Sequence, residues 1–418
     1  MFRNMRFFVV VGLVALVGSA CSWVAVGHDG GHSFFSRSDT KLTTANIGGI
    51  HELWRGTGSG GSAPVVANGR AFTVQAGNPD RELASYRAAG CGATECDPVW
   101  TQPASGNPVV VGANVVAMAS VVVPPPTCFF NCIIYRGGTF DSASGALATG
   151  SGGGETGGQY PVVADGGLYH WSVAVKYFTP PRPTYLYQLD EPAVDGVTPT
   201  PRIGGYLAPQ PFAVVDGSIY LVVDGRIDAY LKGTQAGCAL NVGCFPTWSA
   251  PLAHGGAWDG LVTVANGSVF ASEINGDVEV FNAAGCGATT CPAVWTAAGG
   301  TVHVGQLAVT DTTLFVPSDD GHLYAFAATG CGAARCAPIW TADLGSGVHA
   351  PAVAGDIVFV TTDGGRLVAL DARGCAASTC SALASVDVGS PVRKPLAISA
   401  GRVFASDESG TLHAFGLS

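Results

Sequence analysis

Eight stretches of the sequence begin alike, with a short apolar run, a tight turn and a second apolar run. They start at Ala63, Asn107, Tyr160, Pro211, Leu261, Gln306, Ala350 and Lys394, at intervals of 44 to 53 residues. A repeat of this length cannot bury its apolar face alone, so it has to pack against copies of itself. The repeat therefore restricts the fold more than any other feature of the chain.

Each unit contains signals for four short strands. Turns such as Asn266-Gly267 and Asp216-Gly217 separate the first two runs, and these residue pairs tolerate the positive φ that β-hairpins require. A second turn leads to a third strand, as in "LYAFAA", and the fourth strand carries a Trp, as in "PIWTA". We therefore expect an all-β, eight-bladed β-propeller of four-stranded antiparallel blades over residues 51–418.

The eighth unit has a third strand, "TLHAFGLS", and no fourth. The segment His51 to Thr57 carries Trp54, like the other fourth strands. We expect this N-terminal strand to complete the last blade and close the ring, which protects sheet edges from pairing with other chains.

Residues 1–20 are typical of an export signal, because Arg3 and Arg6 precede an apolar run that is too short for a confident membrane span. Gly18-Ser19-Ala20-Cys21 resembles a lipobox, with Gly18 where an aliphatic residue is usual. Lipidation of Cys21 would anchor the protein to a membrane, and ordinary cleavage after Ala20 would give a secreted protein. Residues 21–50 form a lead-in segment before the propeller.

The other twelve cysteines form six close pairs. The pairs are Cys91/Cys96, Cys128/Cys132, Cys238/Cys244, Cys286/Cys291, Cys331/Cys336 and Cys375/Cys380. Zinc would need four converging ligands and each pair offers two, while no pair has the Cys-x-x-Cys spacing of redox motifs. Export and pairing favour structural disulfides.

A formal net charge of −10 with scattered Lys and Arg argues against a nucleic-acid partner. His28 and His32 in "GHDGGHS" raise the question of a metal site, but Gly30 and Gly31 between them disfavour the helix that would bring them together. We expect these polar residues to pack on the propeller instead.

The blade starts "PVVANG" and "PVVADG" and the strands "DGHLYAF" and "DGGRLVAL" resemble the pyrroloquinoline-quinone-like (quinoprotein-like) propeller repeat. The resemblance implies that one Trp per blade docks between adjacent blades. That role would fall to Trp54, Trp100, Trp248, Trp295 and Trp340, with Leu383 in the Trp position of the seventh blade. The fit is weakest in the second and third blades, where "PPPTCFFNC" and "YFTPPRPTY" interrupt the pattern.

The family includes quinone-dependent dehydrogenases, which carry adjacent cysteines and a calcium site. This chain has no Cys-Cys pair and no haem attachment motif, and fold alone does not imply activity. We therefore expect no catalytic residues, cofactor or metal, and a quinone- and calcium-dependent dehydrogenase is the alternative. Residues before the blade starts should line the mouth of the central channel. There, Trp258, Asp259, His303, His349 and Arg393 could bind a ligand, or they could be hydrated channel residues with no ligand.

Non-enzymatic relatives include the lipoprotein scaffold of the outer-membrane β-barrel assembly machinery, which this chain resembles in anchor and repeat. The resemblance implies an exported, monomeric binding or scaffold module of the cell envelope, with an envelope protein as partner. Contact with the membrane would be through the lipid anchor alone, at the cell surface or in the periplasm.

Overall fold

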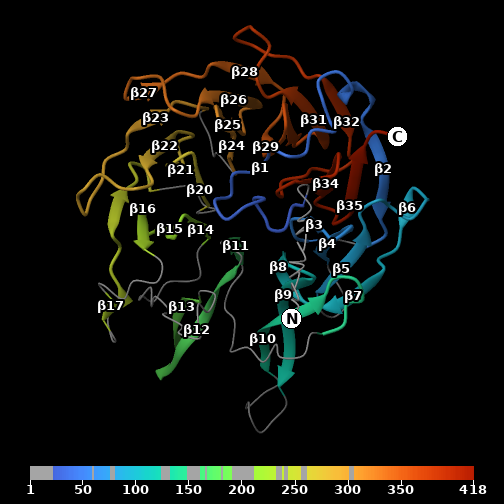
Figure 1. Cartoon of the computed structure of the whole chain (residues 1–418), viewed down its shortest axis with the longest axis horizontal. Coiled ribbons are helices and arrows are strands. Elements are labelled where there is room, and N and C mark those ends of the chain that lie inside the picture. The colour runs from blue at the N-terminus through green and yellow to red at the C-terminus, as the bar shows by residue number, and fades with distance from the viewer. Residues whose placement is uncertain are drawn as a thin grey trace, which may run out of the picture.

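The computed structural model describes residues 22–58, 61–75, 81–123, 132–147, 161–164, 167–179, 182–190, 211–231, 238–239, 243–255, 261–300 and 306–418. These residues form antiparallel β-sheets set around a central axis, and the only helix among them is a short 3-10 turn, η1 (Ile47–Gly49) (Figure 1). The expected all-β propeller fold is thus confirmed. Within this part of the chain, no helix has the length and apolar character that a membrane crossing requires.

We number eight of the sheets in chain order and give their strands from the axis outwards. Sheet 1 contains β3 (Val65–Ala67), β4 (Arg70–Gln75), β5 (Glu82–Arg87) and β7 (Trp100–Pro103). Sheet 2 contains β8 (Ser105–Val111), β9 (Asn114–Val123) and β10 (Cys132–Asp141). Sheet 3 contains β11 (Val162–Ala164), β12 (Gly167–Thr179) and β13 (Arg182–Asp190). Sheet 4 contains β14 (Phe212–Val215), β15 (Ser218–Val223), β16 (Arg226–Leu231) and β19 (Trp248–Pro251).

The remaining sheets lie in the C-terminal half. Sheet 5 contains β20 (Val262–Ala265), β21 (Ser268–Ser272), β22 (Val278–Asn282) and β23 (Trp295–Ala297). Sheet 6 contains β24 (Ala308–Val309), β25 (Thr313–Pro317), β26 (His322–Ala327) and β28 (Trp340–Asp343). Sheet 7 contains β29 (Val348–Ala354), β30 (Ile357–Thr362), β31 (Arg366–Asp371) and β32 (Ala384–Asp387), with β1 (Phe35–Ser36) on its inner edge. Sheet 8 contains β33 (Ala397–Ser399), β34 (Arg402–Ser406), β35 (Leu412–Gly416) and β2 (His51–Gly56).

The turns between the first two strands have the expected chemistry. Asn68, Asp216 and Asn266 have φ of 54°, 48° and 52°, each followed by a glycine with positive φ. Such turns match the twist of the two strands they join. In sheet 8, β2 pairs antiparallel with β35, and Trp54 faces Ala414.

Sheets 2 and 3 differ from the expected four strands, because each has three among the described residues. Their second and third strands are long, with ten residues in β9 and thirteen in β12. The side chains of the Cys128/Cys132 pair lie outside the described part of the structure. The same holds for Cys238/Cys244 of sheet 4, whose backbones pair between β17 (Cys238–Ala239) and β18 (Gly243–Cys244).

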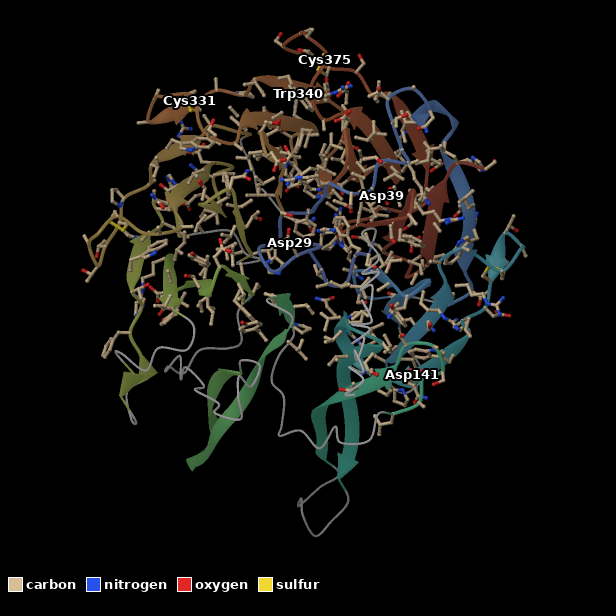
Figure 2. All side chains as sticks on the ribbon, viewed as in Figure 1. Asp29, Asp39, Asp141, Cys331, Trp340 and Cys375 are labelled. Carbon is tan, nitrogen blue, oxygen red and sulfur yellow. A yellow bond between two sulfur atoms is a disulfide. The ribbon has the colours of Figure 1, made fainter. Side chains whose placement is uncertain are left out.

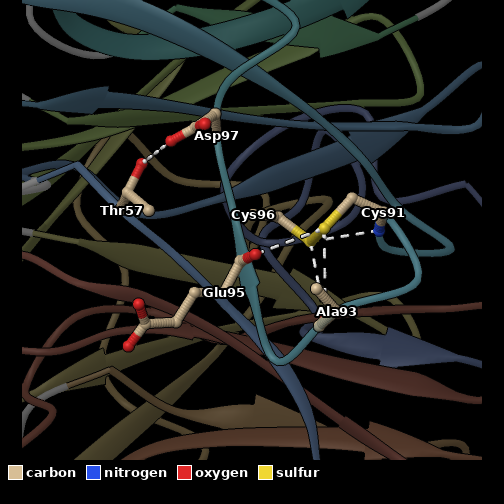
Figure 3. Close-up of a disulfide and its surroundings, with 6 residues drawn as sticks. All are labelled: Thr57, Cys91, Ala93, Glu95, Cys96 and Asp97. Carbon is tan, nitrogen blue, oxygen red and sulfur yellow. Dashed lines mark hydrogen bonds between the residues drawn. A yellow bond between two sulfur atoms is a disulfide. The ribbon is translucent and has the colours of Figure 1, made fainter.

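In sheets 1, 5, 6 and 7 the connection between the third and fourth strands, which we call a Cys loop, crosses to the neighbouring sheet. The structure contains the disulfides Cys91–Cys96, Cys286–Cys291, Cys331–Cys336 and Cys375–Cys380 (Figure 3). Two loops add the short strands β6 (Glu95–Cys96) and β27 (Arg335–Cys336), which pair in parallel with β2 and β23. Thr290 and Thr379 of the other two loops form parallel bridges to Ser249 and Thr341. Each loop therefore fastens its own sheet to the outer strand of the preceding one.

Four of the five outer-strand Trp residues pack against the glycine that precedes the first cysteine of such a loop. A Cβ on Gly330 would lie 3.0 Å from Trp295 Cδ1, and one on Gly374 would lie 2.7 Å from Trp340 Cδ1. Trp54 and Trp248 have the same contact with Gly90 and Gly285, while Trp100 contacts Gly145 in the neighbouring, irregular sheet.

The position assigned to Leu383 is corrected by the strand register. The Leu383 N–H donates to Ala369 O just as the Ile339 N–H donates to Ala325 O, so Leu383 matches the residue before the Trp. Ala384 therefore holds the Trp position in sheet 7. The reason for the error is that Leu383 is the large apolar residue, although its side chain is 39% exposed.

Candidate functional site

Residues 23–39 of the lead-in segment pass through the middle of the ring of sheets (Figure 1). Its carbonyl groups accept hydrogen bonds from one valine N–H on the inner strand of each of six sheets, at 2.7 to 2.8 Å. The donor and acceptor pairs are Val66 to Trp23, Val110 to Val24, Val214 to Gly30, Val264 to Gly31, Val309 to Ser33 and Val353 to Phe34. The segment thus occupies the channel as part of the fold.

Sheet 8 is reached by a side chain of the same segment. The Gly401 N–H donates to both carboxylate oxygens of Asp39, at 3.1 and 2.9 Å, and Asp39 is fully buried. Asp29 and Asp39 both lie in this central region (Figure 2). Gly30 and Gly31 allow the closest approach, because a Cβ there would lie 2.4 Å from Val214 O and 2.1 Å from Val264 O. Larger residues could not follow this path.

A cavity of about 620 Å³ lies at one mouth of the channel, with Val26 and His32 of the lead-in segment among its lining residues. One part of its wall is apolar and comes from sheets 3 to 5 and 8, through Pro161, Pro211, Leu261 and Pro395. The other part is charged and comes from sheets 6 to 8, through Asp319, His349, Asp363 and Arg393.

The charged residues of this mouth are paired with one another. His349 Nε2 lies 2.9 Å from Asp363 Oδ1, and Arg393 Nη2 donates to the same oxygen at 2.7 Å. Arg393 Nη1 donates to Glu408 at 2.6 Å. Burial alone would raise the pKa of Asp363, but the hydrogen bonds from Arg393 and His349 lower it below its ordinary value. Asp363 is therefore a carboxylate at neutral pH, compensated by its neighbours.

Two buried polar side chains also line the cavity. Burial lowers the pKa of His32, whose Nδ1 lies 3.4 Å from Val262 O, so its imidazole is neutral near pH 7. Gln306 donates from Nε2 to Pro351 O at 3.1 Å, while its Oε1 is buried and has no hydrogen-bond partner among the described residues. This oxygen is an acceptor beside a space large enough for a small ligand or water.

The structure brings together only part of the predicted mouth. His349 and Arg393 line the cavity and share Asp363. Trp258, Asp259 and His303 lie outside the described residues, and so does Cys21. His28 and His32 belong to the lead-in segment, where His28 makes an edge contact with Trp23, with ring centroids 4.8 Å apart.

Sequence analysis missed Asp319, Asp363 and Glu408 as mouth residues. All three lie in the turns between second and third strands, "DDGH", "DGGR" and "DESG". The signal that could have found them is the recurrence of the same turn, because a propeller places equivalent turns on one face.

Two carboxylates at this mouth, Asp363 and Glu408, both accept hydrogen bonds from Arg393. The Arg393 guanidinium would lie beside any cation bound to them. Within the described part of the chain, no three His, Cys, Asp or Glu side chains gather closely enough to hold a metal ion. The lead-in segment also contributes His32 and Val26 to the cavity lining.

Comparison with known proteins gives a partial sequence match and a broad structural one. A family model described as outer membrane protein assembly factor BamB matches residues 275–375 and 329–417. Among curated protein sequences, none matches the chain. The chain is similar to the computationally designed protein Ika8, with a TM-score of 0.60 and 14% identity over 88% of this chain and 100% of that one.

Two dehydrogenases share the fold. Quinohemoprotein alcohol dehydrogenase from Comamonas testosteroni has a TM-score of 0.59 and 12% identity, over 94% of this chain and 80% of that one. A europium-containing methanol dehydrogenase has a TM-score of 0.57 and 9% identity, over 95% of this chain and 98% of that one. Identities this low establish the fold and leave the activity open.

The repeat match over residues 275–417 and the shared fold support a pyrroloquinoline-quinone-like β-propeller. The matched repeats include the sheets that supply Asp319, His349, Asp363 and Arg393.

Proposed function

We propose that this protein is an exported, lipid-anchored propeller that acts as a protein-binding scaffold of the cell envelope and catalyses no reaction. The observation that carries this proposal is the path of the lead-in segment, which joins six inner strands through backbone hydrogen bonds and occupies the channel. The space left at the mouth has its charged groups paired with one another. A rigid plugged propeller favours binding through its surface.

Within this proposal the propeller has eight blades, with β2 as the outer strand of the eighth. The pairing of β2 with β35 supports that arrangement, as does the contact of Trp54 with Gly90 of the next sheet. His413 of β35 lies 2.6 Å from Glu52 of β2 and is itself buried, so the two ends of the propeller share an internal ion pair when His413 is protonated. Closure of this kind leaves the ring without an open end.

Export and anchoring rest on the N-terminal sequence and on the similarity of residues 275–417 to the BamB family model. In the cell we expect the mature chain to begin at lipidated Cys21. Metabolic labelling with palmitate should then label the wild type and not a Cys21→Ala variant, which should be exported unlabelled. A label that survives in the variant would contradict lipidation at this position.

The scaffold and the dehydrogenase are separated by two measurements on the purified full-length protein. Titration with pyrroloquinoline quinone and calcium should produce no saturable change in absorbance, and dye-linked alcohol oxidation should be absent. Copurification from envelope membranes should yield a stoichiometric protein partner. Tight one-to-one binding of the quinone would overturn the proposal in favour of the dehydrogenase.

A further inference from the structure

The outer edges of four sheets are covered in the same way. In sheets 4, 5, 6 and 8, a Cys loop of the following sheet runs parallel to the outermost strand. In sheet 5, the N–H groups of Thr296 and Ala298 donate to the carbonyls of Ala334 and Cys336, at 2.9 Å each. Each loop therefore satisfies backbone groups that could otherwise pair with another chain.

The outer edge of β32 in sheet 7 lacks such a cover. Sheet 8 takes its outermost strand, β2, from the N-terminal part of the chain and has no Cys loop between its third and fourth strands. Within the described residues, no strand pairs with the outer edge of β32. Register makes Ser385 and Asp387 the equivalents of Thr296 and Ala298. Both are exposed, whereas Thr296 is half-buried beneath its loop.

The residues around β32 are adapted to the missing loop. The Trp position is filled by Ala384, which packs on the cluster that contains buried Ile47 of η1. The turn η1 lies beside β32, and no hydrogen bond joins the two among those of the described chain. The turn η1 thus provides an apolar contact for Ala384. The outward-facing backbone groups of Ser385 and Asp387 remain available to pair with another strand.

On sheet 5, the charge of the Cys loop is opposite to the charge of the sheet residue that it contacts. Arg335, which faces Thr296 from the Cys loop, donates to both carboxylate oxygens of Asp277 at 2.7 and 2.8 Å. Asp277 directly precedes the third strand, and Arg366 holds the equivalent place in sheet 7. Arg366 is exposed, and its Nε donates to Ser385 Oγ at 2.7 Å. Arg366 thus stands where sheet 5 has an acidic residue. The carboxylate of Asp387, which lies opposite Arg366, accepts from the Gly389 N–H at 2.9 Å, so we expect an incoming segment to meet Arg366 with an acidic residue.

We propose that the outer edge of β32 binds an extended segment of a partner protein, which pairs in parallel with Ser385–Asp387 and places a carboxylate against Arg366. The segment would take the place that Cys loops occupy on the other edges, as strand addition to an exposed sheet edge. This inference rests on the proposed scaffold function and names the class of partner and the surface that holds it.

The chain provides two matched probes for this surface. One is a disulfide-closed peptide with the sequence of residues 88–98, AAGCGATECDP, in which Glu95 precedes the second cysteine. The other is the same peptide with Arg in place of Glu95, the residue type that Arg335 provides at this position in the loop of sheet 6. In Figure 3 the side chain of Glu95 points away from the disulfide. We expect the Glu peptide to bind the full-length protein about fivefold or more tightly than the Arg peptide.

Three variants locate the binding. Arg366→Glu should reverse the preference between the peptides, and Arg87→Glu, the same charge change at the exposed end of β5, should leave it unchanged. Ser385→Pro should abolish binding, because proline removes an edge N–H, and Ser385→Ala should retain it. Hydrogen exchange should show protection of the Ser385 and Asp387 amides when the Glu peptide is added.

Three results would overturn the proposal. They are absence of binding by either peptide, an Arg366→Glu variant with the wild-type preference, and amides of Ser385 and Asp387 that are already protected in the free protein. Protection independent of protein concentration would assign the edge to this chain itself, and protection that grows with concentration would assign it to a second copy. A negative quinone titration alongside any of these would leave the scaffold function standing without this surface.

Discussion

The packing of each Trp on a glycine of the neighbouring Cys loop makes a quantitative prediction. Gly330 and Gly332 lie in the same loop and have φ of +79° and +80°. A Cβ on Gly332 would meet no atom within 4 Å, whereas a Cβ on Gly330 would lie 3.0 to 3.1 Å from three atoms of the Trp295 indole. Alanine at the two positions therefore carries the same backbone strain and differs in one contact.

We expect Gly332→Ala to lower the free energy of unfolding by about 1–2 kcal/mol, the cost of a left-handed conformation for a residue with a Cβ. Gly330→Ala should cost this amount plus about 1–3 kcal/mol, because the buried indole has to move. Trp295 is only 6% exposed, so it has little space to yield.

Urea denaturation, followed by circular dichroism and Trp fluorescence, measures both costs. The Trp295→Leu background is the control, since there the two glycine substitutions should cost the same. Equal costs of Gly330→Ala and Gly332→Ala in the wild-type protein would refute the idea that the indole holds the loop against the neighbouring sheet.

Three further predictions follow from other contacts. Burial and a hydrogen bond with Glu273 raise the pKa of Glu279 to about 7 from 4.5, so the folded state holds more protons than the unfolded state between these values. Stability should thus fall by about 1 kcal/mol as pH rises from 4.5 to 7, after screening by solvent, and thermal melts of Glu279→Gln should lack this fall. His413→Ala should cost about 1–3 kcal/mol, because it removes the hydrogen bonds of a buried side chain with Glu52 and Asp407, and hydrogen exchange in residues 51–56 should rise; exchange as slow as in wild type would contradict this. Mass spectrometry after alkylation without reductant should find Cys286 and Cys291 unmodified, and modified thiols would contradict their disulfide.

The inner strands of the sheets could be predicted from the sequence, because the turns and apolar runs recur, but the three-stranded sheets 2 and 3 and the short strands β6 and β27 could not. The pairing partner of Trp54 was also predictable, since one unit lacked a fourth strand that the N-terminal segment could supply. The assignment of Leu383 to the Trp position of sheet 7 was wrong because it rested on the hydrophobicity of Leu383 and took no account of the strand register. Backbone hydrogen bonds place Ala384 there instead, and its small size is explained by a neighbouring sheet that has no Cys loop.

The candidate site was harder to predict. His349 and Arg393 were found from their position before a blade start, but Asp363 comes from a turn and joins them only when sheets 7 and 8 lie side by side. The lead-in segment has no periodic pattern, so nothing in its sequence indicates a path across the channel. Its hydrogen bonds use carbonyl groups, which every residue has, and Gly30 and Gly31 are needed only for closeness of approach.

The path of the lead-in segment has a consequence for how this protein can evolve. In an open array of repeats, one unit can be lost or duplicated because each contacts only its neighbours. Here a single extended segment meets successive inner strands in the order in which they surround the axis, with one carbonyl for each valine N–H. Loss of a repeat would leave carbonyls in the channel without donors, and a duplication would leave a donor without an acceptor. The segment therefore follows the circumference of the inner ring, and the loss or duplication of one of these six repeats would require a change in its length.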